Sequence, residues 1–341
     1  MESIPKAMPA ASPMEKHEDD DEDQFDEFYK KLPKKQVAGL MLAQHKGFWY
    51  DEPILHGVVT FQKHFESQDS DILLATMPKS GTTWLKALTF AIVNRSKSEH
   101  SISESPLLFQ NPHQLVPFLE LDLYRGGKLP DPNMMITRPR IFATHVPYQC
   151  LSDTLLSNDS KSPRIVYLCR NPLDAFTSLM HFFSQNGALP ADDETSALEE
   201  YFGAFCEGFS IFGPFWDQIL GYWDASLKNS NKVLFLHYED LQRDTPSSVK
   251  KLAEFLGCGF SQQEENQGLV EGLIKLCSLE NLKNLECNKE GDLHLVHTIK
   301  KSTYFRKGKV GDWVNFLTPS MAKRLEGLMT EKFAESGKNV V

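Results

Sequence analysis

The sequence predicts a single α/β domain in which helices flank a central parallel β-sheet. Four short, almost wholly apolar segments lie along the chain, and longer segments with a helical spacing of apolar residues separate them. Short apolar runs of this kind are typical of parallel strands buried on both faces, with helices as the crossovers between them. The expected strands are residues 72–77, 140–144, 164–168 and 232–236.

Several of the expected helices begin beside residues that are typical of a helix start, a capping side chain next to an early proline. The expected helices follow Thr83, Asn171, Gly213, Thr245 and Thr318. The stretches 96–138, 185–195 and 286–312 contain clusters of Ser, Pro, Gly or Asn. We expect surface loops there, which could cover a site.

Length and composition favour one domain. The chain has 341 residues, of which 41% are hydrophobic, and residues 25–341 contain no repeat or linker-like stretch. Residues 1–24 are rich in Pro, Ala and Ser and then in acidic residues. Such a segment has too little apolar surface to offset the entropy lost on ordering, so we expect a disordered acidic leader over 1–24 and one domain over 25–341.

Charge, hydropathy and cysteine spacing argue against several classes of protein. A net charge of −10 disfavours nucleic-acid binding, because the phosphate backbone would be repelled. No apolar segment approaches the roughly 20 residues that cross a bilayer, and no secretory signal is visible at the N-terminus. The six cysteines lack paired spacing, which is typical of reduced thiols. We therefore expect a cytoplasmic protein without a membrane or nucleic-acid partner.

The turn after the first expected strand has the features of an anion site. A strand that ends in Ser80-Gly81-Thr82-Thr83 and continues into a helix directs backbone N–H groups and the positive end of the helix dipole toward one point. Gly81 permits the tight backbone path, the hydroxyls can donate, and Lys79 supplies a compact charge. The order differs from G-x-x-x-x-G-K-[ST], the magnesium-nucleotide turn. An ordinary capped helix start would produce a similar pattern.

Two further positions follow apolar strands in the way that Lys79 does. His145 follows 140–144, and Arg170 follows 164–168. Open parallel sheets bind ligands at the carboxyl ends of their strands, so these three residues are expected to meet in one crevice. Ser178 lies eight residues after Arg170, about two helical turns away, and could contact the same ligand. Each residue by itself could equally be an ordinary packed or surface side chain.

A third cationic segment lies near the C-terminus, where Arg306, Lys307 and Gly308 follow one another. A bidentate cation, a point charge and a permissive backbone can together clamp a terminal phosphate. Taken with PKSGTTWLK (78–86) and CRNPLD (169–174), the motif RKGKVGDW (306–313) gives the chain an order of motifs that resembles the cytosolic sulfotransferase family, and its plant members in particular. The resemblance covers about residues 25–335.

The resemblance implies a sulfotransferase fold, related to that of nucleotide kinases, and a donor, 3′-phosphoadenosine 5′-phosphosulfate (PAPS). It implies that the 5′-phosphosulfate lies among residues 79–83, that Trp84 stacks on the adenine and that Tyr238 contacts the base. An aromatic face is a good platform for a purine, although a core tryptophan would look the same in the sequence. The full set of implied donor-binding residues is Lys79, Ser80, Gly81, Thr82, Thr83, Trp84, Arg170, Ser178, Tyr238, Ser278, Arg306, Lys307 and Gly308.

The chemistry of sulfuryl transfer suggests two catalytic residues. An imidazole with a pKa near neutrality could remove the acceptor's hydroxyl proton, and we expect His145 to be this base. Lys79 would stabilise the charge that develops on the departing 5′-phosphate oxygen, so no metal is required. The resemblance supports both roles and implies that Ser178 holds Lys79 away from the donor until the acceptor arrives.

The sequence departs from the family pattern at three places. Many animal relatives have a lysine where this chain has Ala143, so one supporting cation is missing and Lys79 must carry more of the charge. Leu279 replaces a phenylalanine on the second face of adenine, which we expect to weaken binding by about 1 kcal/mol. The animal dimerisation pattern is matched only at Thr318, and a monomer is favoured.

The acceptor is expected to be a small hydroxylated, largely apolar metabolite. Aromatic residues gather in GFWY (47–50), MHFF (180–183) and FGPFW (212–216), although core packing would explain many of them equally well. The resemblance implies a flavonoid, steroid, hydroxyjasmonate or desulfoglucosinolate class. Two other functions stay open, an Mg-ATP-dependent small-molecule kinase and a non-catalytic nucleotide-binding protein.

Overall fold

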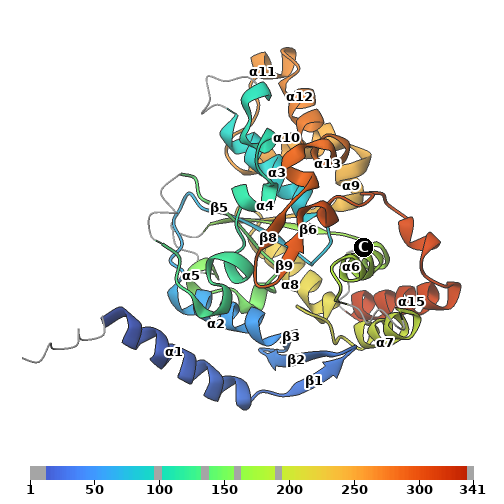
Figure 1. The fold of residues 1–341 in the computed structure, drawn as a ribbon. Helices are drawn as coiled ribbons and strands as arrows, with labels where there is room; N and C mark the ends of the chain where they lie inside the picture. Colours follow the sequence, from blue (N-terminus) through green and yellow to red (C-terminus); the bar gives the residue numbers. More distant parts are fainter. Residues whose placement is uncertain (1–12, 96–101, 132–137, 157–162, 189–193, 336–341) are drawn as a thin grey trace, which may run out of the picture.

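Helices surround a central sheet in the fold (Figure 1). This sheet has four parallel strands in the order β5-β4-β6-β7, which confirms the predicted α/β class. The computed structural model describes residues 13–95, 102–131, 138–156, 163–188 and 194–335. The strands are β4 (Ile72–Thr76), β5 (Ile141–Thr144), β6 (Arg164–Cys169) and β7 (Val233–His237), each within two residues of its predicted bounds. Because β5 and β6 lie on opposite sides of β4, the order in which strands are added to the sheet reverses at β4, where open sheets form their ligand crevice.

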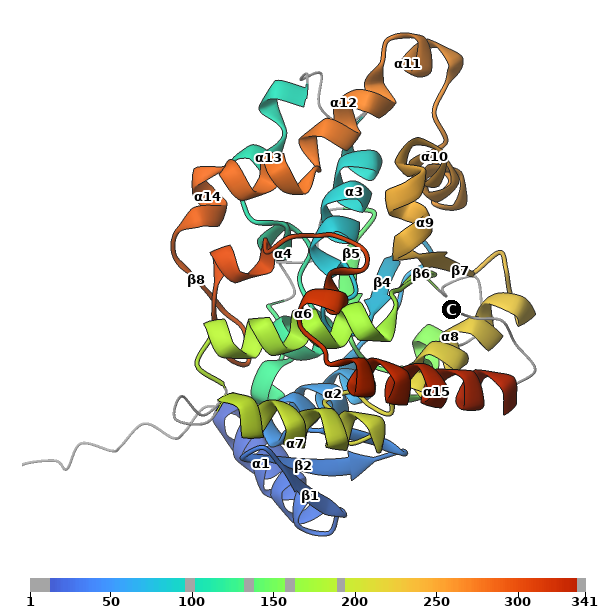
Figure 2. The same cartoon turned by 90° about the vertical axis from the view of Figure 1, so that its right-hand side faces the viewer.

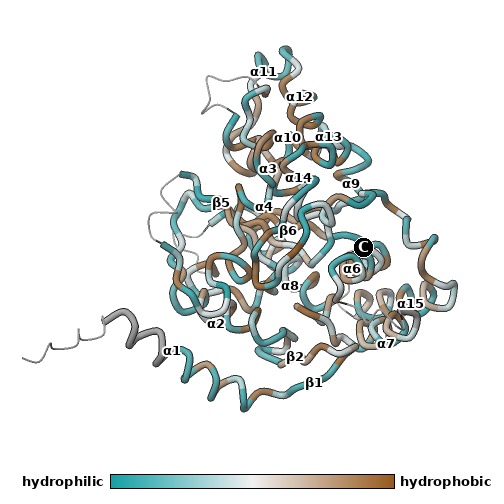
Figure 3. Tube along the Cα trace, in the orientation of Figure 1, coloured by the Kyte–Doolittle hydropathy of each residue, from teal (hydrophilic) through white to brown (hydrophobic). Residues whose placement is uncertain are grey.

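Helices cover both faces of this sheet, because alternate residues of each buried strand point to opposite sides. In β4, Leu74 packs in the cluster with α3 (Thr82–Asn94), α10 (Thr245–Phe255) and α12 (Leu269–Leu276). Leu73 packs on the other side, in the cluster with α2 (Glu52–His64), α6 (Pro172–Gln185) and α8 (Phe215–Lys228). Figure 2 shows the two helical layers above and below the strands, and in Figure 3 many of the apolar segments lie between them.

The five predicted helices are α3, α6, α8, α10 and α15 (Pro319–Glu335), each beginning within two residues of its expected start. Their starts follow the expected capping chemistry. The Asn171 side chain accepts from the N–H of Leu173, and the Asp244 side chain accepts from the N–H of Ser247. Besides these, α2, α12 and the α1 described below, the structure has α4 (Pro112–Leu115), α5 (Asp153–Leu156), α7 (Glu194–Cys206), α9 (Tyr238–Arg243), α11 (Gln262–Asn266), α13 (Leu279–Asn284) and α14 (Glu286–Lys289).

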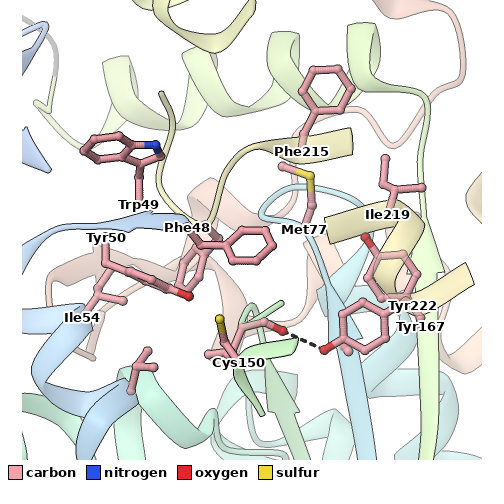
Figure 4. Packing of buried hydrophobic residues seen from close by; sticks show 14 of the residues in the cluster. Phe48, Trp49, Tyr50, Ile54, Met77, Cys150, Tyr167, Phe215, Ile219 and Tyr222 are labelled. Atoms are coloured by element: carbon pink, nitrogen blue, oxygen red, sulfur yellow. Dashed lines mark hydrogen bonds between the residues drawn. The ribbon is translucent and has the colours of Figure 1, made fainter. Parts of the chain in front are cut away.

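A small antiparallel sheet precedes the central one. It consists of β1 (Lys34–Val37), β2 (Leu40–His45) and β3 (Phe48–Tyr50). Trp49 joins this sheet to the main domain, since its N–H donates to Gly213 O at 3.0 Å and its carbonyl accepts from Phe212 N at 2.7 Å. Figure 4 shows Phe48 and Tyr50 in the core beside Cys150, and Tyr167 stacked on Tyr222 with a centroid distance of 4.2 Å.

The disorder expected over residues 1–24 is not what the structure has over residues 13–24, which belong to α1 (Pro13–Lys30). The C-terminal part of α1 is fixed to the domain, because Phe25 is buried and stacks on His56 with a centroid distance of 3.9 Å. Once one end of a helix is fixed, extending it costs little, since nucleation is the costly step. The composition of the segment does not reveal the contact between Phe25 and His56. Residues 1–12 lie outside the described residues.

The stretches expected to be surface loops contain several short elements. The described part of the region 96–138 forms α4, a π-helical turn η3 (Leu119–Leu123) and the 3₁₀ turns η1 (Ile102–Glu104), η2 (Pro106–Leu108) and η4 (Arg125–Gly127). Residues 96–101 and 132–137 lie outside the described residues. The region 286–312 forms α14, a hairpin of β8 (Asp292–His294) and β9 (Thr298–Lys300), and η7 (Lys301–Tyr304), while η8 (Asp312–Asn315) begins at its end. One further turn is η6 (Tyr148–Cys150). In the stretch 185–195, α6 ends at Gln185 and α7 begins at Glu194. Residues 189–193 of this stretch lie outside the described residues.

A buried ion pair fixes the N-terminal edge of the sheet. Arg140 Nε donates to Asp71 Oδ1 at 2.7 Å, and Arg140 Nη2 contacts the second carboxylate oxygen. Both side chains are less than 8% exposed. Their backbones extend the same edge, because Ile72 N donates to Arg140 O and Arg164 N donates to Asp71 O. The pair therefore sets the register of three strands at the edge opposite the cavity described below.

We predict that Arg140→Met lowers the free energy of unfolding by about 3 kcal/mol, because it leaves the Asp71 carboxylate buried without its cation. Urea unfolding followed by circular dichroism measures the change. The matched control is the double variant Asp71→Asn with Arg140→Met, in which no buried charge is left. It should lose less stability than the single variant; a greater loss would contradict this role of the pair.

Candidate functional site

The carboxyl ends of the four parallel strands open into a cavity of about 420 Å³. The chain after each strand contributes at least one lining residue: Lys79 after β4, His145 after β5, Arg170 after β6 and Tyr238 after β7. The structure therefore brings to one crevice the three strand-end residues that the sequence singled out, together with Tyr238. The other sequence-predicted residues that line it are Gly81, Thr82, Thr83, Trp84, Ser178, Ser278, Arg306 and Gly308.

The turn between β4 and α3 has the strained backbone that its glycine permits. Gly81 has φ = +105°, and a Cβ atom there would lie 2.7 Å from Cδ2 of Tyr238, so only glycine fits without displacement. Lys79 also has a positive φ, +66°. The side chain of Ser80 is buried, and it lines a minor cavity instead of the main one. The structure thus separates Ser80 from the residues that face the main cavity.

Lys79 lies among aromatic rings and other cations. Its Nζ is 4.0 Å from the ring centroid of Phe182 and 5.3 Å from that of Tyr304. Arg170 donates from Nη1 to the backbone carbonyl of Lys79 at 3.1 Å. Burial, followed by repulsion from Arg170 and Arg306, lowers the pKa of Lys79 to about 7. An anion in the cavity would favour the charged form of this amine.

The hydroxyls of both threonines of the turn lie within hydrogen-bond distance of another side chain. Thr82 Oγ1 lies 2.7 Å from Thr76 Oγ1, and Thr83 Oγ1 lies 2.9 Å from Nε2 of His113. Thr82 and Thr83 line the cavity at the N-terminus of α3. Because each hydroxyl has one fixed neighbour, its second hydrogen-bonding direction is available to a ligand at the helix N-terminus.

The C-terminal cations are held by one carboxylate. Asp312 accepts from Arg306 Nη1 at 2.6 Å and from Lys307 Nζ at 2.9 Å. Burial opposes ionisation of Asp312, but the hydrogen bonds from Lys307 and Arg306 outweigh it and hold its pKa well below the usual range. Arg306 lines the cavity, whereas the Lys307 side chain is about half exposed and does not. The structure therefore brings Arg306, but not Lys307, to the other cations.

Two arginine nitrogens in this region lack hydrogen-bond partners. The Nε atoms of Arg170 and Arg306 are buried and unpaired, and both side chains line the cavity. A buried, unsatisfied donor is costly, and on a cation it favours an anionic acceptor. Arg170 uses its other nitrogens for Lys79 O and Lys309 O, which fixes the orientation of the guanidinium. The cavity can thus accept anions at two places, near Lys79 and near the two arginines.

Aromatic and small residues form the part of the cavity beside the arginines. Trp84 and Tyr238 are arranged edge to face with a centroid distance of 5.6 Å, and the Tyr238 hydroxyl donates to Gly308 O at 2.9 Å. Gly308 has φ = +60°, and a Cβ there would lie 2.7 Å from Cδ2 of Leu279. Ser278 caps α13 and donates to Lys275 O at 2.9 Å. A flat base fits the chemistry of this part of the cavity.

The His145 ring is oriented by the backbone of the strand next to it. Its Nδ1 lies 2.7 Å from Thr76 O, which can only accept, so Nδ1 carries the hydrogen and Nε2 is the acceptor. Burial, with Lys86 and Lys79 acting in the same direction, lowers the pKa of His145 to about 3. This pKa lies below the value near neutrality that was expected from the sequence, because that expectation did not include burial.

Sequence reasoning missed Glu120, which holds the backbone that carries His145. Its carboxylate accepts from His145 N at 2.7 Å and from Thr144 Oγ1 at 2.9 Å. Burial raises the pKa of Glu120 to about 7, against the effect of these hydrogen bonds. Glu120 lies in the π-helical turn η3, within a stretch that we expected to be a loop, so the sequence offered no signal for it.

Two basic residues near the turn were also missed. His113, on α4, lines the cavity, and Lys86, on α3, is fully buried behind it with Nζ 3.0 Å from His113 Nδ1. Lys86 was detectable in principle, because a lysine within the apolar helix segment WLKALTFAI lies one turn after Thr82 and Thr83 and so near the same face. His113 is brought close only by the fold.

The remainder of the cavity is apolar. Of the aromatic residues considered from the sequence, Phe182, Phe183 and Phe212 line it, whereas the other aromatic residues of the segments 47–50 and 212–216 pack elsewhere, as Figure 4 shows for Phe48, Tyr50 and Phe215. The connection between β8 and β9 completes the wall. It is attached by Val296 N, which donates to Leu121 O at 2.8 Å, and by His297, whose Nε2 lies 2.8 Å from Asp51 Oδ2.

Comparison with sequence families and curated proteins gives consistent similarities. Residues 69–337 match the family model of the sulfotransferase domain. Cytosolic sulfotransferase 6 of Arabidopsis thaliana is 46% identical over 303 residues, which cover 89% of this chain and 90% of that protein. Cytosolic sulfotransferase 15 of the same plant is 42% identical over 358 aligned positions, which cover 99% and 97%. Among the described residues, we find no helix long and apolar enough to span a membrane.

Comparison with solved structures finds the same fold. A sulphotransferase structure from Arabidopsis thaliana has a TM-score of 0.70 and 36% identity, and the match covers 99% of this chain and 100% of that one. A mouse sulfotransferase complexed with PAP, adenosine 3′,5′-bisphosphate, has a TM-score of 0.65 and 25% identity over 87% of this chain and 95% of that one. Retinol dehydratase, solved with androsterone and PAP, shares the fold at 19% identity and a TM-score of 0.67, over 92% and 93%.

Proposed function

This chain belongs to the sulfotransferase family, and on that premise we propose which of its residues bind PAPS and transfer its sulfuryl group. The protein is a PAPS-dependent sulfotransferase that acts on a small-molecule acceptor. One observation carries the assignment of residues: Lys79, His145, Arg170 and Arg306 line a single cavity. Arg170 and Arg306 have buried Nε donors without partners. A site for a bisphosphorylated nucleotide needs cationic donors of this kind for its phosphates.

The two anionic groups of the donor are assigned to the two cationic parts of the cavity. The 5′-phosphosulfate binds at the turn, where Lys79, Thr82 and Thr83 face the cavity at the helix N-terminus. The 3′-phosphate binds at Arg170, Arg306 and Ser178 beside Gly308. The adenine lies between Trp84 and Leu279, within reach of Tyr238. Ser80 and Lys307 act from outside the cavity, through the backbone of the turn and through Asp312 respectively.

The transfer step follows from the hydrogen bonds of His145. With its hydrogen on Nδ1, the imidazole accepts the acceptor's hydroxyl proton at Nε2. The hydroxyl oxygen forms a bond to sulfur, and the bond from sulfur to the 5′-phosphate oxygen breaks with its electron pair on that oxygen. Lys79 stabilises this charge. The negative charge of the bound donor raises the pKa of both His145 and Lys79, which makes the imidazole a stronger base in the complex than in the free protein.

The departures from the family pattern affect the two ends of the donor differently. Leu279 lines the cavity and packs on the adenine without an aromatic face, which weakens nucleotide binding by about 1 kcal/mol. Ala143 is fully buried in β5 and leaves no cation at its own position. Lys86 is close enough to lower the pKa of His145, so a lysine from α3 contributes charge near the base.

The acceptor proposed for this cavity is a hydroxylated, largely apolar metabolite of the flavonoid, steroid, hydroxyjasmonate or desulfoglucosinolate class. The wall beyond His145 supports an apolar acceptor, because it is formed mainly by aliphatic and aromatic side chains. These residues are Ile54, Leu121, Leu179, Phe182, Phe183, Ile211, Phe212, Leu295, Val296 and Ile299. A screen of plant alcohols with labelled PAPS identifies the acceptor.

The remaining parts of the proposal concern the whole protein. We assign residues 25–341 to one sulfotransferase domain, with α1 attached to it through Phe25. The relatives are named cytosolic, in agreement with the expected cytoplasmic location. We propose a monomer that requires no bound metal. A kinase that uses Mg-ATP is the main competing function, and its G-x-x-x-x-G-K-[ST] turn is not present in the sequence.

We predict that His145→Ala retains PAP binding but abolishes turnover, whereas Arg306→Ala lowers PAP affinity about tenfold or more by removing a charge-assisted hydrogen bond. Calorimetry with the metal chelated, together with an assay of labelled PAPS, measures both effects. Arg243→Ala, an exposed arginine bound to Asp240, is the matched control and should bind PAP as the unaltered protein does. Preference for Mg-ATP over PAP, or full activity of His145→Ala, would contradict the proposal.

We also predict that PAP affinity falls as pH rises from 7 to 9. Lys79 has a pKa of about 7 in the free protein and a higher pKa beside a bound phosphate, so binding takes up a proton in this interval. Well below pH 7 the lysine is already charged in the free protein and makes no further difference. The phosphates of PAP have completed their second ionisation, near pH 6, before the interval begins. Calorimetry of PAP binding in buffers of different ionisation enthalpy measures how many protons the protein takes up on binding.

Lys79→Arg is the control for this pH dependence, because a guanidinium stays charged throughout the interval. Its PAP affinity should be nearly constant from pH 7 to 9. An equal decline in the unaltered protein and in Lys79→Arg would assign the titration to another group.

A further inference from the structure

A chain of hydrogen bonds leads from the buried amine of Lys86 to the anion-binding turn. Lys86 Nζ lies 3.0 Å from His113 Nδ1, and His113 Nε2 lies 2.9 Å from Thr83 Oγ1. The residues come from two elements, α3 and α4, and the first two are almost completely buried. Thr83 and His113 line the cavity. The mechanism described above uses Lys86 only as a charge near His145, and it gives His113 no role.

Packing holds the imidazole of His113 in one place. Its ring stacks on Phe118 with a centroid distance of 5.4 Å. The ring of Tyr304 is also in close contact, with a centroid distance of 4.1 Å. Asn111 Oδ1 accepts from His113 N at 2.9 Å and caps the short helix α4. Lys86 Nζ is itself 3.3 Å from the ring centroid of Phe118. Neither side chain can therefore turn away from the other without disrupting this cluster.

An anion at Thr83 permits only one direction for these hydrogen bonds. An unprotonated phosphate oxygen only accepts, so the Thr83 hydroxyl must donate to it and must accept from His113. His113 then carries its hydrogen on Nε2, and its Nδ1 accepts from Lys86. A lysine amine donates in either protonation state, so the direction does not depend on its charge. In the opposite direction the Thr83 hydrogen would point at His113, and oxygen lone pairs would face the anion.

We propose that Lys86 and His113 are positioning residues for the donor's 5′-phosphate, because they fix the Thr83 hydroxyl as a hydrogen-bond donor to it. The inference rests on the proposed function, in which the turn binds that phosphate. Without His113 the hydroxyl rotates freely, and its hydrogen must be oriented at the moment of binding. The role is distinct from that of His145, whose ring contacts Thr76 on the other side of the turn.

The first test compares two nucleotides that differ only in the 5′-phosphate. His113→Phe retains an aromatic ring between Phe118 and Tyr304 but cannot contact Thr83 through nitrogen. We expect its affinity for PAP to fall about tenfold, and its affinity for adenosine 3′-monophosphate to stay unchanged. Lys86→Met should show the same selective loss to a smaller extent. His113→Gln, whose side-chain amide can donate to Thr83, should recover most of the PAP affinity.

A double-mutant cycle separates positioning from packing. Thr83→Val removes the hydroxyl at constant shape, so His113→Phe should have almost no further effect on PAP binding in that background. Equal losses for both nucleotides, or full additivity with Thr83→Val, would overturn the proposal. If the unaltered protein bound adenosine 3′-monophosphate but gained nothing from the 5′-phosphate, the proposed function itself would fail, which is a different outcome.

A measurement on the unaltered protein does not depend on how the variants fold. Nitrogen NMR of ¹⁵N-labelled imidazoles distinguishes a ring that carries hydrogen on Nε2 from one that carries it on Nδ1. In the PAP complex we expect the hydrogen of His113 on Nε2 and that of His145 on Nδ1. The resonances of the two rings are assigned with His113→Gln and His145→Ala respectively. A PAP complex in which His113 carries its hydrogen on Nδ1 would overturn the proposal.

Discussion

The site depends on positive charge held in an apolar, mostly buried cavity. Lys79, Arg170 and Arg306 line this cavity, and Lys86 lies behind it, within a chain whose net charge is −10. Taking a cation out of water is costly, and the lowered pKa of Lys79 reflects that cost. The cost decreases when an anion enters. The unfavourable burial of charge in the free protein is therefore what makes the cavity selective for an anionic ligand.

The structure holds these cations largely with groups that leave their charge available. Arg170 donates to two backbone carbonyls, Lys79 lies over Phe182, and Lys86 lies over Phe118. Carbonyl dipoles and aromatic faces attract a cation without neutralising it. Asp312 is different, because it forms ion pairs with Arg306 and Lys307, of which Arg306 lines the cavity. The carboxylate of Glu120 binds the backbone of His145 instead of a cation.

The parts of the fold with strong periodicity were predictable, and the parts fixed by distant contacts were not. The four parallel strands and the helices α3, α6, α8, α10 and α15 have clear apolar patterns and start signals. Helix α1 and the β8–β9 hairpin do not. Phe25 anchors α1 on His56, and the hairpin is attached through Val296 to Leu121, residues far away in the sequence. No local pattern contains such contacts.

The sequence by itself determined which side chains follow the strand ends. A strand, a glycine turn and a helix are local structures, and parallel pairing then places Lys79, His145 and Arg170 at one edge. Only the tertiary structure decided their chemical state. The pKa of His145, the exclusion of Ser80 and Lys307 from the cavity, and the contact between His113 and Thr83 all depend on segments packed around the turn. Burial and hydrogen-bond direction are properties of those neighbours, which a linear pattern does not specify.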